Sequence, residues 1–178
     1  MQDLLITLLK AHQSVNATEE NHRLHTLDFV SSTPACTNRD TSAGHITASA
    51  WILSPDGKAA LLTHHKKLNR WLQLGGHLED DPDIRAAAAR EAREESGIES
   101  LQLLSDALFD VDVHPIPARK NEPEHYHYDL RFLFQSPVTE FRVSDESHDL
   151  AWVPLAQLVA DGSNESVSRM ARKTLPGV

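Results

Sequence analysis

The sequence predicts an α/β layered sandwich with a mixed sheet, preceded by a helical N-terminal extension. Apolar residues near the N-terminus recur with a helical period, alternating apolar and polar residues then indicate several strands, and one long helical segment stands between two groups of strands. Mixed strands with a central helix and terminal helices are typical of this layered class. At 178 residues, of which 40% are hydrophobic, the chain is long enough for one domain with its own core.

The first part of the chain is expected to be helical. Residues 1–44 should form an extension packed on a domain made by residues 45–178. Leu5 and Leu9 lie on one face of a first helix, and a second helix is expected from about Thr18 to Phe29, after a start signal at Ser14 and Asn16.

The rest of the chain alternates strands, turns and helices. Ser54-Pro55-Asp56-Gly57 is typical of a β-turn, so the segments on either side should form a hairpin. The expected strands are Thr47–Leu53, Lys58–Thr63, Trp71–Leu74, Ala107–Val113, Tyr126–Phe134 and Leu150–Val153, and the expected closing helices are Pro154–Leu158 and Ser163–Leu175.

Composition excludes several classes of partner. The net charge is −9 and no run of Lys and Arg offers a surface for phosphate backbones, so a nucleic acid polymer is not expected to bind. No apolar run is long enough to span a membrane. The one cysteine, Cys36, fits a reducing compartment, and we expect a cytoplasmic protein. The sequence leaves open whether the chain forms a homodimer.

The helix expected after Asp83 carries an unusual set of carboxylates. Asp81 is a candidate N-cap, Pro82 suits the first helical position, and Gly97 suits the position just after the last turn. At 100° per residue, Glu91 and Glu95 lie on the apolar stripe that should face the sheet, and Glu94 lies beside it.

A solvated helix with mixed charges is the ordinary explanation of such a pattern. Here, however, carboxylates roughly 5–6 Å apart would repel by about 3 kcal/mol at an effective dielectric constant of 20. Glu94 and Glu95 also lie in the last turn, where the helix dipole disfavours negative charge. A hard divalent cation would offset both costs, and the Gly75-Gly76 turn could bring a backbone carbonyl to the same ion.

Residues 76–98 resemble the signature of the Nudix hydrolase family. That signature is Gly, five residues, Glu, seven residues, Arg-Glu, an apolar residue, any residue, Glu-Glu, any residue, Gly and an apolar residue. The spacing from Arg90-Glu91 through Glu94-Glu95 to Gly97 matches it fully. The resemblance implies a Nudix-like α/β/α sandwich and a metal-dependent pyrophosphohydrolase.

The resemblance also implies roles for individual residues. Glu91, Glu94 and Glu95 would be metal ligands with the carbonyl of Gly75, and Arg90 would orient the glutamates. The cofactor would be Mg²⁺ or Mn²⁺, and the general base would be Glu94 or a loop carboxylate.

Two positions depart from the signature. Pro82 stands where the family has its first Glu, and Ala92 replaces a bulkier apolar residue. The first Glu usually supports the arginine, so Asp81 or Asp83 is expected to take over that role for Arg90.

Other polar residues are candidates for contact with substrate or water. His64, Lys66 and Arg70 lie in the most basic stretch of the chain and could bind phosphate. His127 and Arg131, on one predicted strand, could contact substrate. Glu146 precedes a predicted strand, where many Nudix enzymes have a general base or an additional ligand.

Histidines offer a second metal hypothesis. His125, His127 and Asp129 share one face of a predicted strand, which is a spacing that zinc could use. A polar sheet face that lines a pocket is the interpretation we favour.

These features predict an enzyme that cleaves a diphosphate bond in a nucleoside diphosphate derivative or a similar small molecule. The alternatives are a catalytically weak Nudix-fold module that binds a nucleotide, which Pro82 favours, and a plain structural domain. A structural domain would leave the inward-facing carboxylates without a cause.

Overall fold

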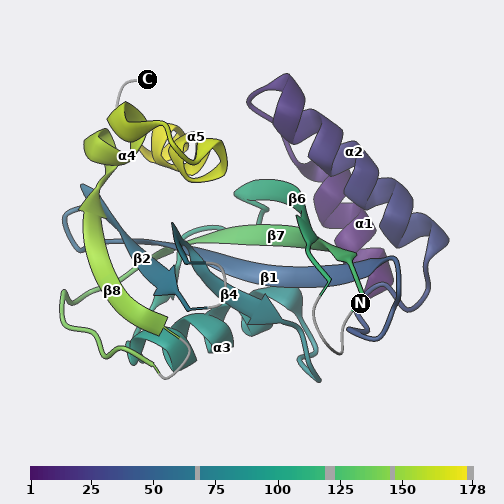
Figure 1. The fold of residues 1–178 in the computed structure, drawn as a ribbon, viewed down its shortest axis with the longest axis horizontal. Helices are drawn as coiled ribbons and strands as arrows, with labels where there is room; N and C mark the ends of the chain where they lie inside the picture. Colours follow the sequence, from purple (N-terminus) through teal and green to yellow (C-terminus); the bar gives the residue numbers. More distant parts are fainter. Residues whose placement is uncertain (67–68, 119–122, 145–146, 176–178) are drawn as a thin grey trace. The chain divides into compact units, whose positions relative to one another are not determined.

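The computed structural model describes residues 1–66, 69–118, 123–144 and 147–175 of the chain. Within these residues it has an α/β fold with helices at both ends of the sequence (Figure 1). The described strands pair in the order β3-β2-β1-β7-β5, with β4 on β1, β6 on β7 and β8 on β2. The α/β fold class and the helical N-terminal extension are therefore confirmed.

The chain divides into two compact units. The first unit comprises Met1–Ala48, Gly76–Ala88 and Ser105–Phe132, and the second comprises Ser49–Gly75, Ala89–Leu104 and Leu133–Val178. Strands β1 (Gly44–Leu53) and β7 (His125–Gln135) contribute residues to both units.

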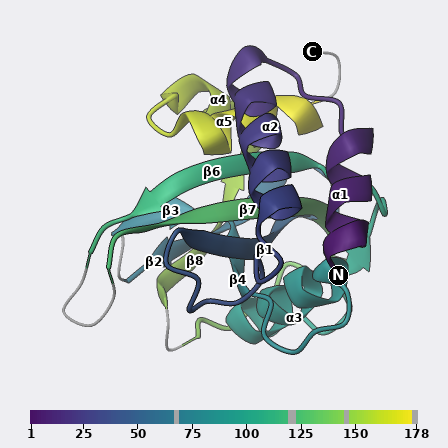
Figure 2. The same ribbon diagram turned by 90° about the vertical axis from the view of Figure 1, so that its right-hand side faces the viewer.

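Two N-terminal helices pack together in the first unit. Helices α1 (Gln2–Ala11) and α2 (Ala17–Ser32) lie side by side (Figure 2). The side chain of Asn16 accepts a hydrogen bond from the Glu19 N–H, which caps α2 where the sequence predicted its start.

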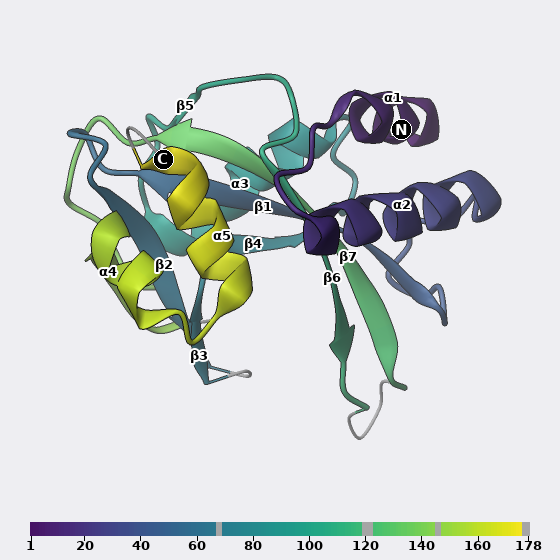
Figure 3. The same cartoon turned by 90° about the horizontal axis from the view of Figure 1, so that it is seen from above.

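Helix α2 packs against β6 (Asp110–Ile116) within the same unit. The ring of Phe29 on α2 stacks on that of Tyr128 on β7, with centroids 4.1 Å apart. Strands β6 and β7 form an antiparallel pair (Figure 3). In its register Asp110 lies opposite Arg131. The extension is thus anchored by aromatic and apolar contacts.

The second unit is built around β2 (Ala59–His65). This strand pairs with the end of β1, with β3 (Arg70–Leu72) and along its length with β8 (Ser147–Pro154). Strand β5 (Gln102–Leu103) also belongs to the second unit, whereas β4 (Leu74–His77) has its first two residues in the second unit and its last two in the first. The expected strand Trp71–Leu74 is therefore divided between β3 and β4.

The closing helices also belong to the second unit. Helices α4 (Leu155–Asp161) and α5 (Glu165–Thr174) pack on one another, as Figure 3 shows. The Ser168 hydroxyl donates to the Leu158 carbonyl at 2.8 Å, which ties the two helices together. None of the described helices has both the length and the apolar character that a bilayer span requires.

A buried arginine links β6 and β7 in the first unit. The guanidinium of Arg131 contacts Asp129 at 2.7 Å, Asp110 at 3.0 Å and Asp112 at 3.3 Å, and its side chain is only 3% exposed. Burial opposes the charge of Arg131, but the three aspartates raise its pKa above the ordinary value. The result is a buried ion-pair cluster made of Arg131 and these aspartates.

We expect Arg131→Met to lower the free energy of unfolding by about 3–5 kcal/mol, because the substitution leaves buried carboxylates without their cation. Urea unfolding followed by circular dichroism measures this change. Arg172, which pairs with Glu165 on the exposed side of α5, is the matched control, and Arg172→Met should cost less than about 1 kcal/mol. An Arg131→Met protein within about 1 kcal/mol of wild type would show that the cluster does not stabilise the fold.

Candidate functional site

Helix α3 (Ile84–Ser96) carries the predicted carboxylates. Its N-cap is Asp83, since the Asp83 carboxylate accepts from the Arg85 N–H at 2.8 Å and the Asp83 carbonyl accepts the first helical bond, from Ala87. The expected N-cap at Asp81, with Pro82 as first helical residue, was therefore wrong by two residues. Gly97 has φ +67° and its N–H bonds to the Arg93 carbonyl, which confirms the predicted end of the helix.

One face of α3 is buried. Ile84, Ala87, Ala88 and Ala92 are fully buried, and Glu95 on the same face is only 6% exposed. Burying a carboxylate in this way is costly unless a cation or several donors compensate it. The helical period puts Glu95 at this face, as predicted.

Arg90 connects the other two glutamates. Its Nη1 atom donates to Glu91 Oε1 at 2.9 Å and to Glu94 Oε2 at 3.0 Å. The Glu91 side chain is 14% exposed and that of Glu94 is 60% exposed. Arg90 therefore offsets part of the repulsion that the sequence predicted, but it adds one positive charge to a group of three carboxylates.

The departure at Pro82 can now be described further. Pro82 is exposed. The Asp83 carboxylate accepts hydrogen bonds from the Nε and Nη2 atoms of Arg85. Asp83 is thus occupied with Arg85 and not with Arg90, contrary to one of the two alternatives from the sequence. Support of Arg90 by Asp81 stays a prediction.

Gly75 precedes this helix in the sequence and lies in β4, in the second unit with Glu91, Glu94 and Glu95. Its φ of +155° is a conformation that residues with a side chain rarely adopt. A glycine is therefore required to present the Gly75 carbonyl in this orientation. Its role as a metal ligand stays a prediction.

The donor set fits a hard divalent cation. Mg²⁺ and Mn²⁺ prefer carboxylate and carbonyl oxygens, and they accept carboxylates together with water and substrate phosphates. The buried Glu95 is the observation that carries this fit, because a carboxylate at a mostly buried position gains most from a nearby cation.

Three predicted phosphate-binding residues lie in the second unit. His64 is on β2, its ring stacks on Trp71 with centroids 5.2 Å apart, and its Nε2 atom lies 3.1 Å from Asn69 Oδ1. Lys66 and Arg70 are exposed. Lys66 and Arg70 are therefore accessible to a phosphate, while Glu146 lies outside the described residues.

The remaining two predicted substrate residues lie in the first unit. Arg131 is enclosed by aspartates in the ion-pair cluster, so it is not available to a substrate, and we correct that expectation. Asp129 is likewise bonded to Arg131 and to the Thr47 hydroxyl, and so it does not act with His125 and His127 as a zinc ligand set.

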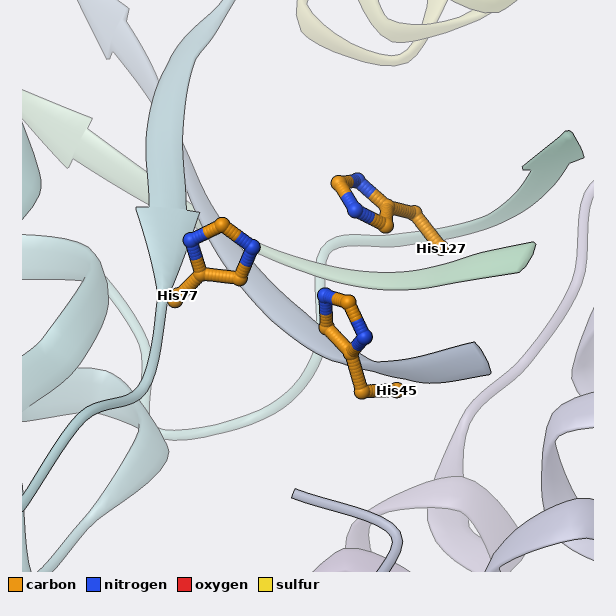
Figure 4. Close-up of side chains that lie close together, drawn as sticks. All are labelled: His45, His77 and His127. Atoms are coloured by element: carbon orange, nitrogen blue, oxygen red, sulfur yellow. The ribbon is translucent and has the colours of Figure 1, made fainter. Parts of the chain in front are cut away.

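His127 belongs instead to a group of histidines that the sequence did not predict. Its ring lies near those of His45 and His77, as Figure 4 shows. The three residues are up to 82 positions apart in the chain and come from three strands, so no local spacing could have shown that they meet.

Comparison with known proteins places this chain in a family. A family model described as the NUDIX domain matches residues 44–173. The chain belongs to the Nudix family. Members of this family are hydrolases that act on phosphorus-containing acid anhydrides, and the match begins at Gly44, the first residue of β1. No curated protein matches the sequence significantly.

Solved structures agree with the Nudix assignment. A NUDIX-family hydrolase from Clostridium perfringens is 25% identical, with a TM-score of 0.54, and the match covers 73% of this chain and 95% of that one. The Ap4A hydrolase of C. elegans, in a binary complex, is 21% identical with a TM-score of 0.53, covering 72% and 93%. The dihydroneopterin triphosphate pyrophosphohydrolase of E. coli is 15% identical with a TM-score of 0.56, covering 75% and 96%. At these identities the last two show a common fold.

Proposed function

We propose that this Nudix protein is a metal-dependent pyrophosphohydrolase that cleaves a diphosphate bond in a nucleoside diphosphate derivative or a similar small molecule. One observation carries the proposal. Helix α3 carries Glu91 and Glu94, both bonded to Arg90, and a buried Glu95, at the spacing of the family signature.

Glu91, Glu94 and Glu95 would hold the cation, with the Gly75 carbonyl as a further ligand. When bound, Mg²⁺ or Mn²⁺ supplies polarisation of the diphosphate oxygens and lowers the pKa of bound water. Arg90 keeps Glu91 and Glu94 in fixed orientations through its two hydrogen bonds, which reduces the reorganisation that ligand binding requires.

The chain's own residues must also accept a proton from the attacking water. Glu94 suits this role, because its side chain is 60% exposed and one of its oxygens, Oε1, has no hydrogen bond to Arg90. Glu146 is the other candidate for the general base. Hydrolysis would give two fragments that each end in phosphate.

Substrate recognition would rest on exposed cations and an aromatic ring. Lys66 and Arg70 would offset the negative charge of a diphosphate on a protein whose net charge is −9, and His64 would contact the same group. Trp71, which is 38% exposed and stacked on His64, offers a flat surface to a base. The names of two structural relatives, an Ap4A hydrolase and a dihydroneopterin triphosphate pyrophosphohydrolase, support a small polyphosphorylated substrate.

A nucleotide-binding module without turnover is the second candidate function. Pro82 favours it, since the first glutamate of the family signature is absent. The ligand glutamates and their arginine favour the enzyme, because a module that only binds would not need a carboxylate buried at the end of a helix.

We expect Glu94→Gln and Glu95→Gln each to lower kcat by about 100-fold or more, which corresponds to about 2.7 kcal/mol of transition-state stabilisation. The assay uses the best substrate from a panel of nucleoside diphosphate derivatives, dinucleoside polyphosphates and nucleoside triphosphates with Mg²⁺ or Mn²⁺. Glu99→Gln, an exposed neighbour just beyond the helix, is the matched control and should keep wild-type kcat. Activity within about threefold of wild type for both test variants would remove these residues from the site.

Divalent ions should also stabilise the folded protein. Since the cation binds only the folded state, Mg²⁺ or Mn²⁺ at about 100 times its Kd should raise Tm by roughly 5–10 °C. The double variant Glu91→Gln/Glu95→Gln should lose this rise, because it lacks two ligands, while Glu99→Gln keeps it. Differential scanning calorimetry with and without EDTA makes the measurement. Thermal melts of wild type that do not respond to millimolar ions would contradict the proposed ligand set.

A further inference from the structure

Three histidines from distant parts of the sequence meet in the first unit. His45 lies on β1, His77 on β4 and His127 on β7. One ring nitrogen from each lies within 4.8 Å of the other two. Figure 4 shows the rings turned toward a common space between the strands.

His45 is the residue that calls for an explanation. It is only 2% exposed, and neither of its ring nitrogens has a hydrogen-bond partner among the described residues. A buried polar atom without a partner costs about 1–3 kcal/mol, and a neutral imidazole contains both a donor and an acceptor. A ligand that bonds to at least one of the two ring nitrogens of His45 would remove this cost.

The neighbours of His45 are themselves imidazoles. The centroid of its ring lies 4.9 Å from that of His77, 4.7 Å from that of His127 and 5.1 Å from that of His125. Neutral imidazole is the form that binds metal ions, and the rings of three other histidines lie around His45.

We propose that His45, His77 and His127 form a binding site for Zn²⁺ or a transition-metal ion of similar preference. Imidazole nitrogen is a common ligand of zinc at about 2.0–2.1 Å, so tetrahedral geometry requires nitrogens roughly 3.3 Å apart. Small rotations of the three side chains bring their nitrogens from within 4.8 Å of one another to this separation. Three protein ligands leave the fourth position for water or another small ligand.

This site differs in chemistry from the carboxylates of α3. Imidazole suits zinc, copper, nickel and iron, whereas carboxylate and carbonyl oxygens suit Mg²⁺ and Mn²⁺. The histidines belong to the first unit and the three glutamates to the second. The two ligand sets are therefore expected to select different metals, and occupancy of one can be measured without activity at the other.

The test measures metal binding directly. The full chain, without a histidine tag, carries Glu91→Gln, Glu94→Gln and Glu95→Gln so that the carboxylates do not contribute. After treatment with EDTA, it is titrated with Zn²⁺ by calorimetry and with Co²⁺ by visible absorption. We expect one ion per chain, the strong visible bands of a tetrahedral nitrogen site with Co²⁺, and a rise in Tm of about 5 °C or more at 100 times the Kd for Zn²⁺.

Variants of the three histidines assign the site. His45→Ala and His77→Gln should each weaken Zn²⁺ binding by about 100-fold or more, because each removes one of three ligands. His25→Ala, an exposed histidine in the same unit, is the matched control and should leave the Kd unchanged. If His45→Ala fails to fold by circular dichroism, His77→Gln decides the result, because His77 is less buried.

Two outcomes would overturn the proposal. One is the absence of stoichiometric Zn²⁺ binding in the glutamate-substituted chain. The other is binding whose Kd is the same in His77→Gln as in His25→Ala, which would locate the ion elsewhere. Neither outcome bears on hydrolysis of a diphosphate, so failure of the histidine site and failure of the proposed enzyme activity are distinguishable.

Discussion

The cost of burying a carboxylate at the end of α3 is the physical constraint on which the candidate site depends. Glu95 lies on the same face as Ile84, Ala87 and Ala92, a position that an apolar residue would fill at no electrostatic cost. The position also faces the negative end of the helix dipole. A bound cation would offset the electrostatic cost of a glutamate at this position. The same cation would also reduce the repulsion between Glu95 and the adjacent Glu91 and Glu94, which Arg90 offsets in part.

Two groups of charged residues, one around Arg131 and one on α3, each have one guanidinium and three carboxylates, and they differ in their access to solvent. Around Arg131, one guanidinium bonds to three aspartates and the group is closed to solvent, so its role is structural. On α3, the guanidinium of Arg90 bonds to Glu91 and Glu94, and Glu94 extends toward solvent. Both groups carry more negative than positive charge, and in the α3 group Glu94 is accessible to a divalent ion from solvent. Access to solvent therefore distinguishes the structural cluster from the proposed ligand-binding one.

Local signals in the sequence predicted the elements that local chemistry determines. Asn16 caps α2, Gly97 ends α3 and the helical period places Glu95 on the buried face, because each depends on residues within about one turn. The start of α3 was wrong by two residues, since Asp81 and Asp83 offer equivalent side chains and only the fold selects Asp83.

Pairing between strands was not predictable in the same way. Alternation correctly placed His127, Asp129 and Arg131 on one strand face, but their partners come from other strands. Asp110 on β6 forms an ion pair with Arg131, and the ring of His45 on β1 contacts that of His127 on β7. Both contacts depend on how the strands pair in the folded chain. A period of two residues predicts which face of a strand a side chain lies on, but not which residues of the neighbouring strand lie opposite it. For this reason Arg131, which we predicted to contact substrate, proved to be structural.

Product analysis by phosphorus NMR tests the central claim most directly. The wild-type chain is incubated with a nucleoside diphosphate derivative or a dinucleoside polyphosphate in the presence of Mg²⁺ or Mn²⁺, while calorimetry measures binding of the same compound. We predict that the diphosphate resonances disappear and that two products ending in phosphate appear, with no reaction in EDTA. Calorimetric binding without any change in the phosphorus spectrum, for every diphosphate tested, would contradict the account and identify a nucleotide-binding module.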